Sequence, residues 1–99
     1  MRLSKFEQNI IKQTAEQIFG IEVKVFIFGS RINDNLKGGD IDIYIEVSKD
    51  NVNLLEKKIK FLVGLDDKLG EQKIDVVINS GQKNNRPIFQ LAKANGVQL

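Results

Sequence analysis

Two aspartates inside an apolar strand are the feature that most restricts how this chain can fold. Asp40 and Asp42 open residues 40–47, where polar and apolar side chains alternate with the period of two of a β-strand. Aspartate is uncommon in strands, and residues at i and i+2 project from one face with Cα atoms about 6.7 Å apart. Two carboxylates so placed repel each other unless a cation lies between them. The pattern therefore predicts either a cation site or the solvent-facing side of an edge strand.

A third aspartate favours the cation site. Asp75 is the only acidic residue of a third predicted strand at residues 73–78, where a carboxylate is costly unless it is paired or coordinated. If that strand neighbours residues 40–47, the carboxylate lies within a sheet spacing of about 4.8 Å. Three converging carboxylates are typical of metal-assisted phosphoryl chemistry. Tyr44 falls on the same face, where it would either line the site or pack against a neighbouring helix.

A Gly-Ser pair follows the strand predicted at residues 22–28. Gly29 carries no Cβ, so a ligand can approach its backbone closely, and Ser30 can cap the turn that follows. Free N–H groups in such a turn bind anions. The alternative is a routine strand-to-helix turn. No Gly-Lys-Ser/Thr follows, so this is not the Walker phosphate loop.

The remaining periodicity predicts a small mixed sheet with helices packed on it, in an α/β (α+β) fold made of one domain, residues 1–99. The expected order is α-β-α-β-α-β-α, with helices at residues 3–19, 30–36 (a short turn), from the capping residues 48–51 to 69, and 87–96, and a short edge strand at 97–99. The apolar character of both faces near Phe28 predicts an interior strand. The second long helix has its apolar positions at Leu55, Ile59, Leu62, Val63 and Leu69.

Composition excludes several chemistries. The chain has no Cys and no His, so thiolate or imidazole metal sites, Ser-His-Asp triads and disulfides are ruled out. A net charge of +2 is too small to predict direct nucleic-acid binding, and the lysines near residues 57–60 are expected to form a solvated helix face. No apolar run is long enough for a membrane span or a signal peptide, so a cytoplasmic protein is predicted.

The motifs together resemble those of a known superfamily. Residues 28–31 (Phe-Gly-Ser-Arg), 40–43 (Asp-Ile-Asp-Ile) and Asp75 resemble the DNA polymerase β-type nucleotidyltransferases. The block is similar to that of the minimal members, the MNT proteins, which are the antitoxin halves of HEPN–MNT toxin–antitoxin pairs. The likeness covers roughly residues 20–99.

The resemblance implies roles for the residues of the turn. Gly29 and Ser30 would cradle the phosphates of a nucleotide, with ATP or another NTP as the substrate. Arg31 would contact phosphate or the partner protein. Nine residues separate Ser30 from the first aspartate of the pair, one fewer than the minimal members usually have.

The resemblance also implies roles for the carboxylates and an overall function. Asp40 and Asp42 would bind Mg²⁺, and Asp75 would be the third carboxylate, binding the metal and helping to activate the attacking hydroxyl. The implied enzyme is a protein adenylyltransferase-like nucleotidyltransferase that moves AMP, or another NMP, to a hydroxyl of a HEPN-type toxin. The alternative is an antitoxin binding module that neutralises its partner by covering it, without turnover.

Overall fold

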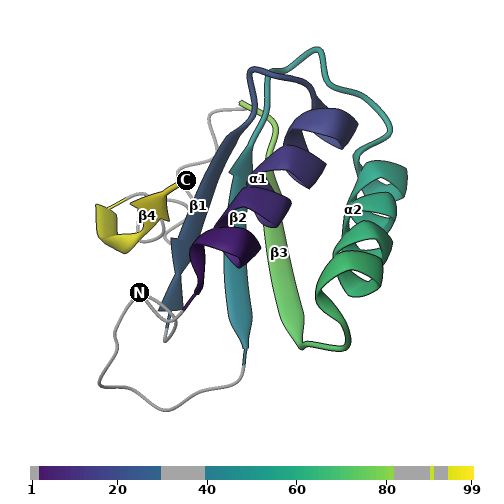
Figure 1. Ribbon diagram of the computed structural model, residues 1–99. Coiled ribbons are helices and arrows are strands. Elements are labelled where there is room, and N and C mark those ends of the chain that lie inside the picture. The colour runs from purple at the N-terminus through teal and green to yellow at the C-terminus, as the bar shows by residue number, and fades with distance from the viewer. Residues whose placement is uncertain (1–2, 30–39, 82–89, 91–93) are drawn as a thin grey trace.

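The computed structural model describes residues 3–29, 40–81, 90 and 94–99. In these residues two helices and four strands follow one another as α1 (Lys5–Phe19), β1 (Lys24–Phe28), β2 (Ile41–Glu46), α2 (Leu54–Leu69), β3 (Ile74–Asn79) and β4 (Val97–Gln98). Both helices lie on one face of the sheet (Figure 1). Neither helix is long and apolar enough to cross a membrane.

The sheet is mixed, as predicted, with the strand order β3-β2-β1-β4. β1 runs antiparallel to both β2 and β4, whereas β2 and β3 are parallel. The interior position predicted for β1 and the edge position predicted for the last strand are therefore confirmed. The end of β1 and the beginnings of β2 and β3 meet at one end of the sheet, the lower end in Figure 1.

The predicted order α-β-α-β-α-β-α is wrong for the described residues, which give α-β-β-α-β-β. The short helical turn predicted at residues 30–36 lies outside the described residues, as does most of the helix predicted at 87–96. Within that second segment only 90 and 94–96 are described, and of these 90, 94 and 95 are helical, as predicted. The short strand expected at residues 97–99 pairs with β1 as β4, so it adds a final β to the order.

The helix α1 begins and ends close to where its sequence predicts. Ser4 and Glu7 form a reciprocal capping box, with the Ser4 hydroxyl accepting from the Glu7 N–H at 3.1 Å and the Glu7 carboxylate accepting from the Ser4 N–H at 3.0 Å. Gly20 ends the helix at a positive φ of 106°, which a glycine adopts readily. These caps satisfy N–H groups that would otherwise lack partners, which fixes the helix boundaries.

The helix α2 departs from prediction at its start and in its buried face. It begins at Leu54, after the expected capping residues 48–51. The Asn51 side chain donates to the Phe19 carbonyl at 2.7 Å and ties this connection to α1. The residues of α2 that are buried in the core are Phe61 and Leu65. Most of the apolar positions predicted for this helix are exposed.

The main core lies between the helices and one face of the sheet. It contains the side chains of Ile11, Ala15, Phe19, Val25, Ile27, Ile41, Ile43, Ile45, Val47, Phe61, Leu65 and Val76, all buried. The rings of Phe19 and Phe61 meet edge to face at 5.8 Å between centroids and join the two helices. Each fully buried aliphatic or aromatic side chain contributes roughly 1.5–3 kcal/mol. This core holds the strands, and therefore the aspartates, in place.

Candidate active site

The register of the sheet brings two of the three predicted aspartates together. Asp42 of β2 pairs with Asp75 of β3 in the parallel ladder, and on its other side it pairs with Phe28 at the end of β1. The neighbours of both aspartates along their own strands face the helices. Both carboxylates therefore project from the opposite face, with Cα atoms about 4.8 Å apart. The adjacency predicted for Asp75 is confirmed.

Gly29 lies directly against Asp42. Its φ of 80° is in the left-handed region that disfavours other residues, and a Cβ added there would collide with the Asp42 carboxylate, whose Cγ would be 3.1 Å away. The turn after β1 therefore requires glycine both for its backbone conformation and for the space that Asp42 fills. The carboxylate lies against Gly29, the first residue of the turn that the sequence predicts as a phosphate cradle.

Crowding of negative charge perturbs Asp42. Partial burial, the Asp75 carboxylate and the Asp40 carboxylate, in that order, raise the pKa of Asp42 above its usual value. All three effects disfavour the charged form. A cation near Asp42 would relieve this repulsion, and carboxylate oxygens are the donors that Mg²⁺ prefers. The donor chemistry of the pair fits a hard divalent cation.

Asp40 has a different partner. Its carboxylate lies 3.6 Å from the ammonium of Lys73, and both side chains are substantially exposed. In the part of the chain that the structure describes, no three acidic side chains converge closely enough to share one metal ion. Asp42 and Asp75 are therefore the pair that would hold a metal, whereas Asp40 faces Lys73. Lys73 was not predicted as a partner of Asp40, although it lies only two positions before Asp75 in the sequence.

Ser30 and Arg31, the other predicted nucleotide-binding residues, lie outside the described residues. Their roles remain predictions. The one part of the predicted phosphate turn that can be located is Gly29, which closes β1 beside Asp42.

Tyr44 packs inside the protein rather than lining an open site. Its ring is fully buried and lies 5.6 Å from that of Phe26 on the neighbouring strand β1. Its hydroxyl donates to the Glu46 carboxylate at 3.0 Å and accepts from the Asn79 side chain at 3.1 Å. Burial is the main cause that raises its pKa above the usual value. Of the two roles expected from the sequence, full burial is consistent with packing rather than with lining an open site, and the contact found in the described residues is with Phe26 of β1.

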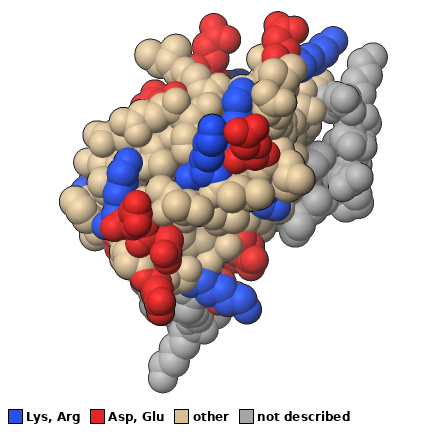
Figure 2. Space-filling model, turned by 90° about the vertical axis from the view of Figure 1, so that its right-hand side faces the viewer, with Lys and Arg blue, Asp and Glu red and all other residues tan. Residues whose placement is uncertain are grey.

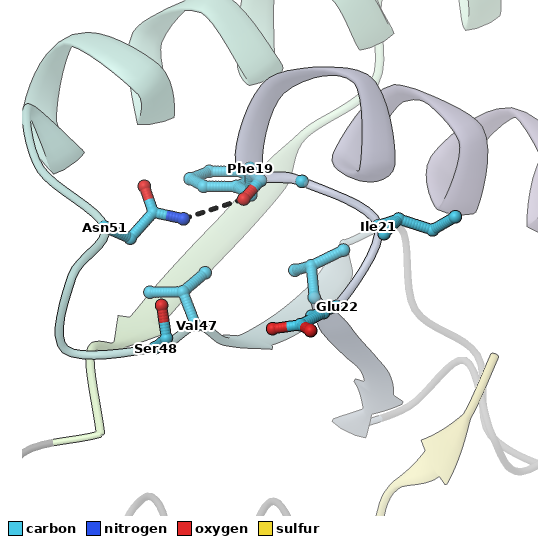
Figure 3. A pocket seen from close by; sticks show the side chains of 8 residues that line it. Phe19, Ile21, Glu22, Val47, Ser48 and Asn51 are labelled. Atoms are coloured by element: carbon cyan, nitrogen blue, oxygen red, sulfur yellow. Dashed lines mark hydrogen bonds between the residues drawn. The ribbon is translucent and has the colours of Figure 1, made fainter.

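A hollow of about 240 Å³ lies at the other end of the sheet, where α1 ends and β2 leads toward α2 (Figure 3). Phe19, Val47, Ser48 and Asn51 line it, and the hydrogen bond from Asn51 to Phe19 runs along its wall. Its single acidic lining residue is Glu22. It holds no carboxylate pair, so the aspartate pair at the opposite end is the better candidate for phosphoryl chemistry.

Paired carboxylates beside a glycine at the end of a strand are an arrangement that suits metal-assisted phosphoryl transfer. The chain matches the nucleotidyltransferase domain family over residues 9–94, and because this is most of its length it belongs to that family. Members of this polymerase β-like family generally use an NTP and a divalent metal, which implies transferase activity. A comparison with curated proteins found no match. The superfamily level of the resemblance is therefore confirmed.

Proposed function

We propose that the chain is a magnesium-dependent nucleotidyltransferase that moves AMP, or another NMP, from an NTP to a hydroxyl group. The observation that carries this proposal is that Asp42 lies against Gly29 on one side and pairs with Asp75 of the neighbouring strand on the other. The neighbouring negative charges raise the pKa of Asp42, and a bound cation would offset this repulsion.

The residues divide the reaction between them. Asp42 and Asp75, joined by Asp40, would hold Mg²⁺, which supplies charge neutralisation for the phosphates. Asp75 would accept the proton of the attacking hydroxyl. The hydroxyl oxygen forms a bond to the α-phosphorus while the bond from that phosphorus to the bridging oxygen breaks, and pyrophosphate leaves. Gly29 gives the phosphates close access to the backbone of the turn, with Ser30 and Arg31 proposed as further contacts.

The proposed acceptor is a hydroxyl on a HEPN-type toxin, so that the chain acts as its antitoxin. Support for this partner comes from the resemblance of residues 28–31 and 40–43 to the minimal members of the superfamily. A cytoplasmic location follows from the same proposal.

The second candidate is an antitoxin that binds and covers its partner without turnover. Two observations favour it. Asp40 has Lys73 as a partner at 3.6 Å, and the spacer after Ser30 is one residue shorter than usual. Either feature would misplace a reacting phosphate, and small misplacements lower rates strongly.

Intact-mass analysis of the co-expressed partner separates the two candidates. The partner should gain the mass of one or more nucleotidyl groups with the native chain and none with Asp42→Asn, while Asp66→Asn on the surface of α2 serves as the control. Losing a metal ligand should lower the rate by roughly three powers of ten or more. A partner that is silenced yet unmodified by the native chain would favour occlusion.

Titration calorimetry tests the site without a partner. ATP should bind in the presence of Mg²⁺ and lose most of its affinity when EDTA is added. Equal affinity with and without the metal would contradict the proposed site.

A further inference from the structure

Lys73 brings a positive charge to the aspartates of the candidate site. Its ammonium lies 3.6 Å from the Asp40 carboxylate, and its carbonyl accepts from the Ile41 N–H at 2.9 Å. The ladder between β2 and β3 therefore extends to Lys73, which directly precedes β3. Its backbone is fixed by the sheet, whereas its side chain is 75% exposed and free to change partner.

Four charged side chains share one side of the sheet. Asp42 pairs with Asp75 in the register of β2 and β3. Asp40 and Lys73 come two positions earlier on the same two segments. Because residues two apart along a strand project from one side, the ion pair lies on the side that carries the carboxylate pair, about 6.7 Å away along the strands. One row of this array holds opposite charges, and the next row holds like charges.

The contact between Asp40 and Lys73 is weak enough to be exchanged. Ion pairs this exposed contribute little to stability, because water and salt screen them. A divalent cation carries twice the charge of an ammonium, so it competes with Lys73 for Asp40. The lysine ammonium is a compact charge on a flexible stem, and it binds phosphate as well as carboxylate.

We propose that Lys73 holds Asp40 in the metal-free protein and passes to a phosphate of the nucleotide when Asp40 binds a divalent cation. This inference rests on the proposed function, and it makes Lys73 a positioning residue of the same site. Gly29 closes β1 at the end of the sheet where Lys73 lies, so the phosphates and the ammonium would meet there. The exchange keeps charges balanced, because Lys73 offsets a carboxylate before loading and a phosphate afterwards.

Lys73 is expected to act individually and not as part of a basic surface. Figure 2 shows the side of the molecule that carries α2, where the described Lys side chains are mixed with Asp and Glu. Lys24 supplies a matched control. It is exposed and lies on the carboxylate side of the sheet, but at the opposite end, because it pairs with Glu46 whereas Phe28 pairs with Asp42.

Metal binding without nucleotide tests the first half of the exchange. Mn²⁺ is the probe, because electron paramagnetic resonance measures the free ion directly. Lys73→Met should bind Mn²⁺ about twofold to fivefold more tightly than the native chain. Lys73→Arg keeps the charge and should bind no more tightly than the native chain, and Lys24→Met should match it. In an Asp40→Asn background, Lys73→Met should change the affinity no further, because the contact is already gone.

Calorimetry of ATP binding at saturating Mg²⁺ tests the second half. Lys73→Met should bind ATP about threefold to tenfold more weakly, because a charge-assisted hydrogen bond to phosphate is lost. Lys73→Arg should recover most of the affinity, and Lys24→Met should keep the native value. Circular dichroism checks that each variant is folded.

The two expected shifts have opposite signs, which a loss of folding would not produce. The inference is overturned if Lys73→Met leaves either affinity at the native value, or if its effect on Mn²⁺ persists in the Asp40→Asn background. A native chain that binds neither Mn²⁺ nor ATP with Mg²⁺ overturns the proposed function, and this inference with it. A native chain that binds both, with Lys73→Met making no difference, overturns the inference alone.

Discussion

The aspartate pair of the sheet and the outer face of α2 both hold side chains in energetically unfavourable environments. At the first, carboxylates of β2 and β3 are crowded and the pKa of Asp42 rises. At the second, aliphatic side chains face solvent. The difference lies in what would satisfy each region: a cation and phosphates in the first, removal from water in the second. Local conflicts of this kind, inside an otherwise consistent fold, are expected at functional sites.

The largest effect should separate the two faces of α2 itself. Phe61→Ala removes a fully buried ring and should lower the free energy of unfolding by about 3–5 kcal/mol. Ile59→Ala should change it by no more than about 0.5 kcal/mol in dilute protein, because Ile59 does not contact the core. Urea unfolding at low micromolar concentration measures both. A comparable loss from Ile59→Ala would mean that this exposed side chain supports the fold of the monomer.

An intermediate effect is expected at Gly29. Gly29→Ala adds a Cβ against the Asp42 carboxylate at a positive φ and should lower the free energy of unfolding by about 2–4 kcal/mol. Gly70→Ala is the matched control, because Gly70 has the same φ of 80° with open space around it, and it should cost only about 1 kcal/mol. Combining Gly29→Ala with Asp42→Gly should bring the loss at position 29 down to the control value. No such rescue would show that Asp42 does not fill that space.

The smallest effect concerns pH. Because the folded state raises the pKa of Asp42, its ionised form opposes folding at neutral pH, and this penalty disappears as the pH falls through the raised pKa toward 3.8. Asp42→Asn should therefore be more stable than the metal-free native chain at pH 7, and the difference should shrink on acidification. Thermal unfolding of both proteins between pH 7 and about pH 4 measures it. A difference that grows as the pH falls would contradict the crowding of the carboxylates.

Periodicity in the sequence predicted the strands and the faces of the aspartates, because a period of two assigns each side chain to one side of a sheet. The same argument misassigned α2, where apolar residues occupy much of the circumference. Of the apolar positions identified in the sequence, Leu62 and Leu69 pack against the core, whereas Leu55, Ile59 and Val63 are exposed. Phe61 and Leu65, which were not among them, are the fully buried residues of this helix. Sequence spacing identifies which residues share a face, but the layer that packs on the helix decides which face is buried.

The Asp40–Lys73 ion pair could not be predicted for a different reason. The two residues precede neighbouring strands that are joined through a helix, and their approach depends on the register of β2 against β3. Asn51 shows the same limit. A capping role fits its local sequence, but the carbonyl of Phe19, far away in the chain, accepts its hydrogen bond instead. Contacts between distant segments are set by topology and not by neighbouring residues.

The pairing of β4 with β1 also constrains the order in which the protein assembles. Phe26 pairs with Gln98 and Ile27 with Val97, and the N–H of Leu99 donates to the Val25 carbonyl at 2.8 Å. The chain between β1 and β4 is much longer than the chain between β1 and β2, so bringing β4 to β1 costs more conformational entropy. We therefore expect the β1–β4 pair to form late. During synthesis, one edge of β1 therefore waits without its strand partner until residues 97–99 have left the ribosome, when a short polypeptide segment closes that side of the sheet.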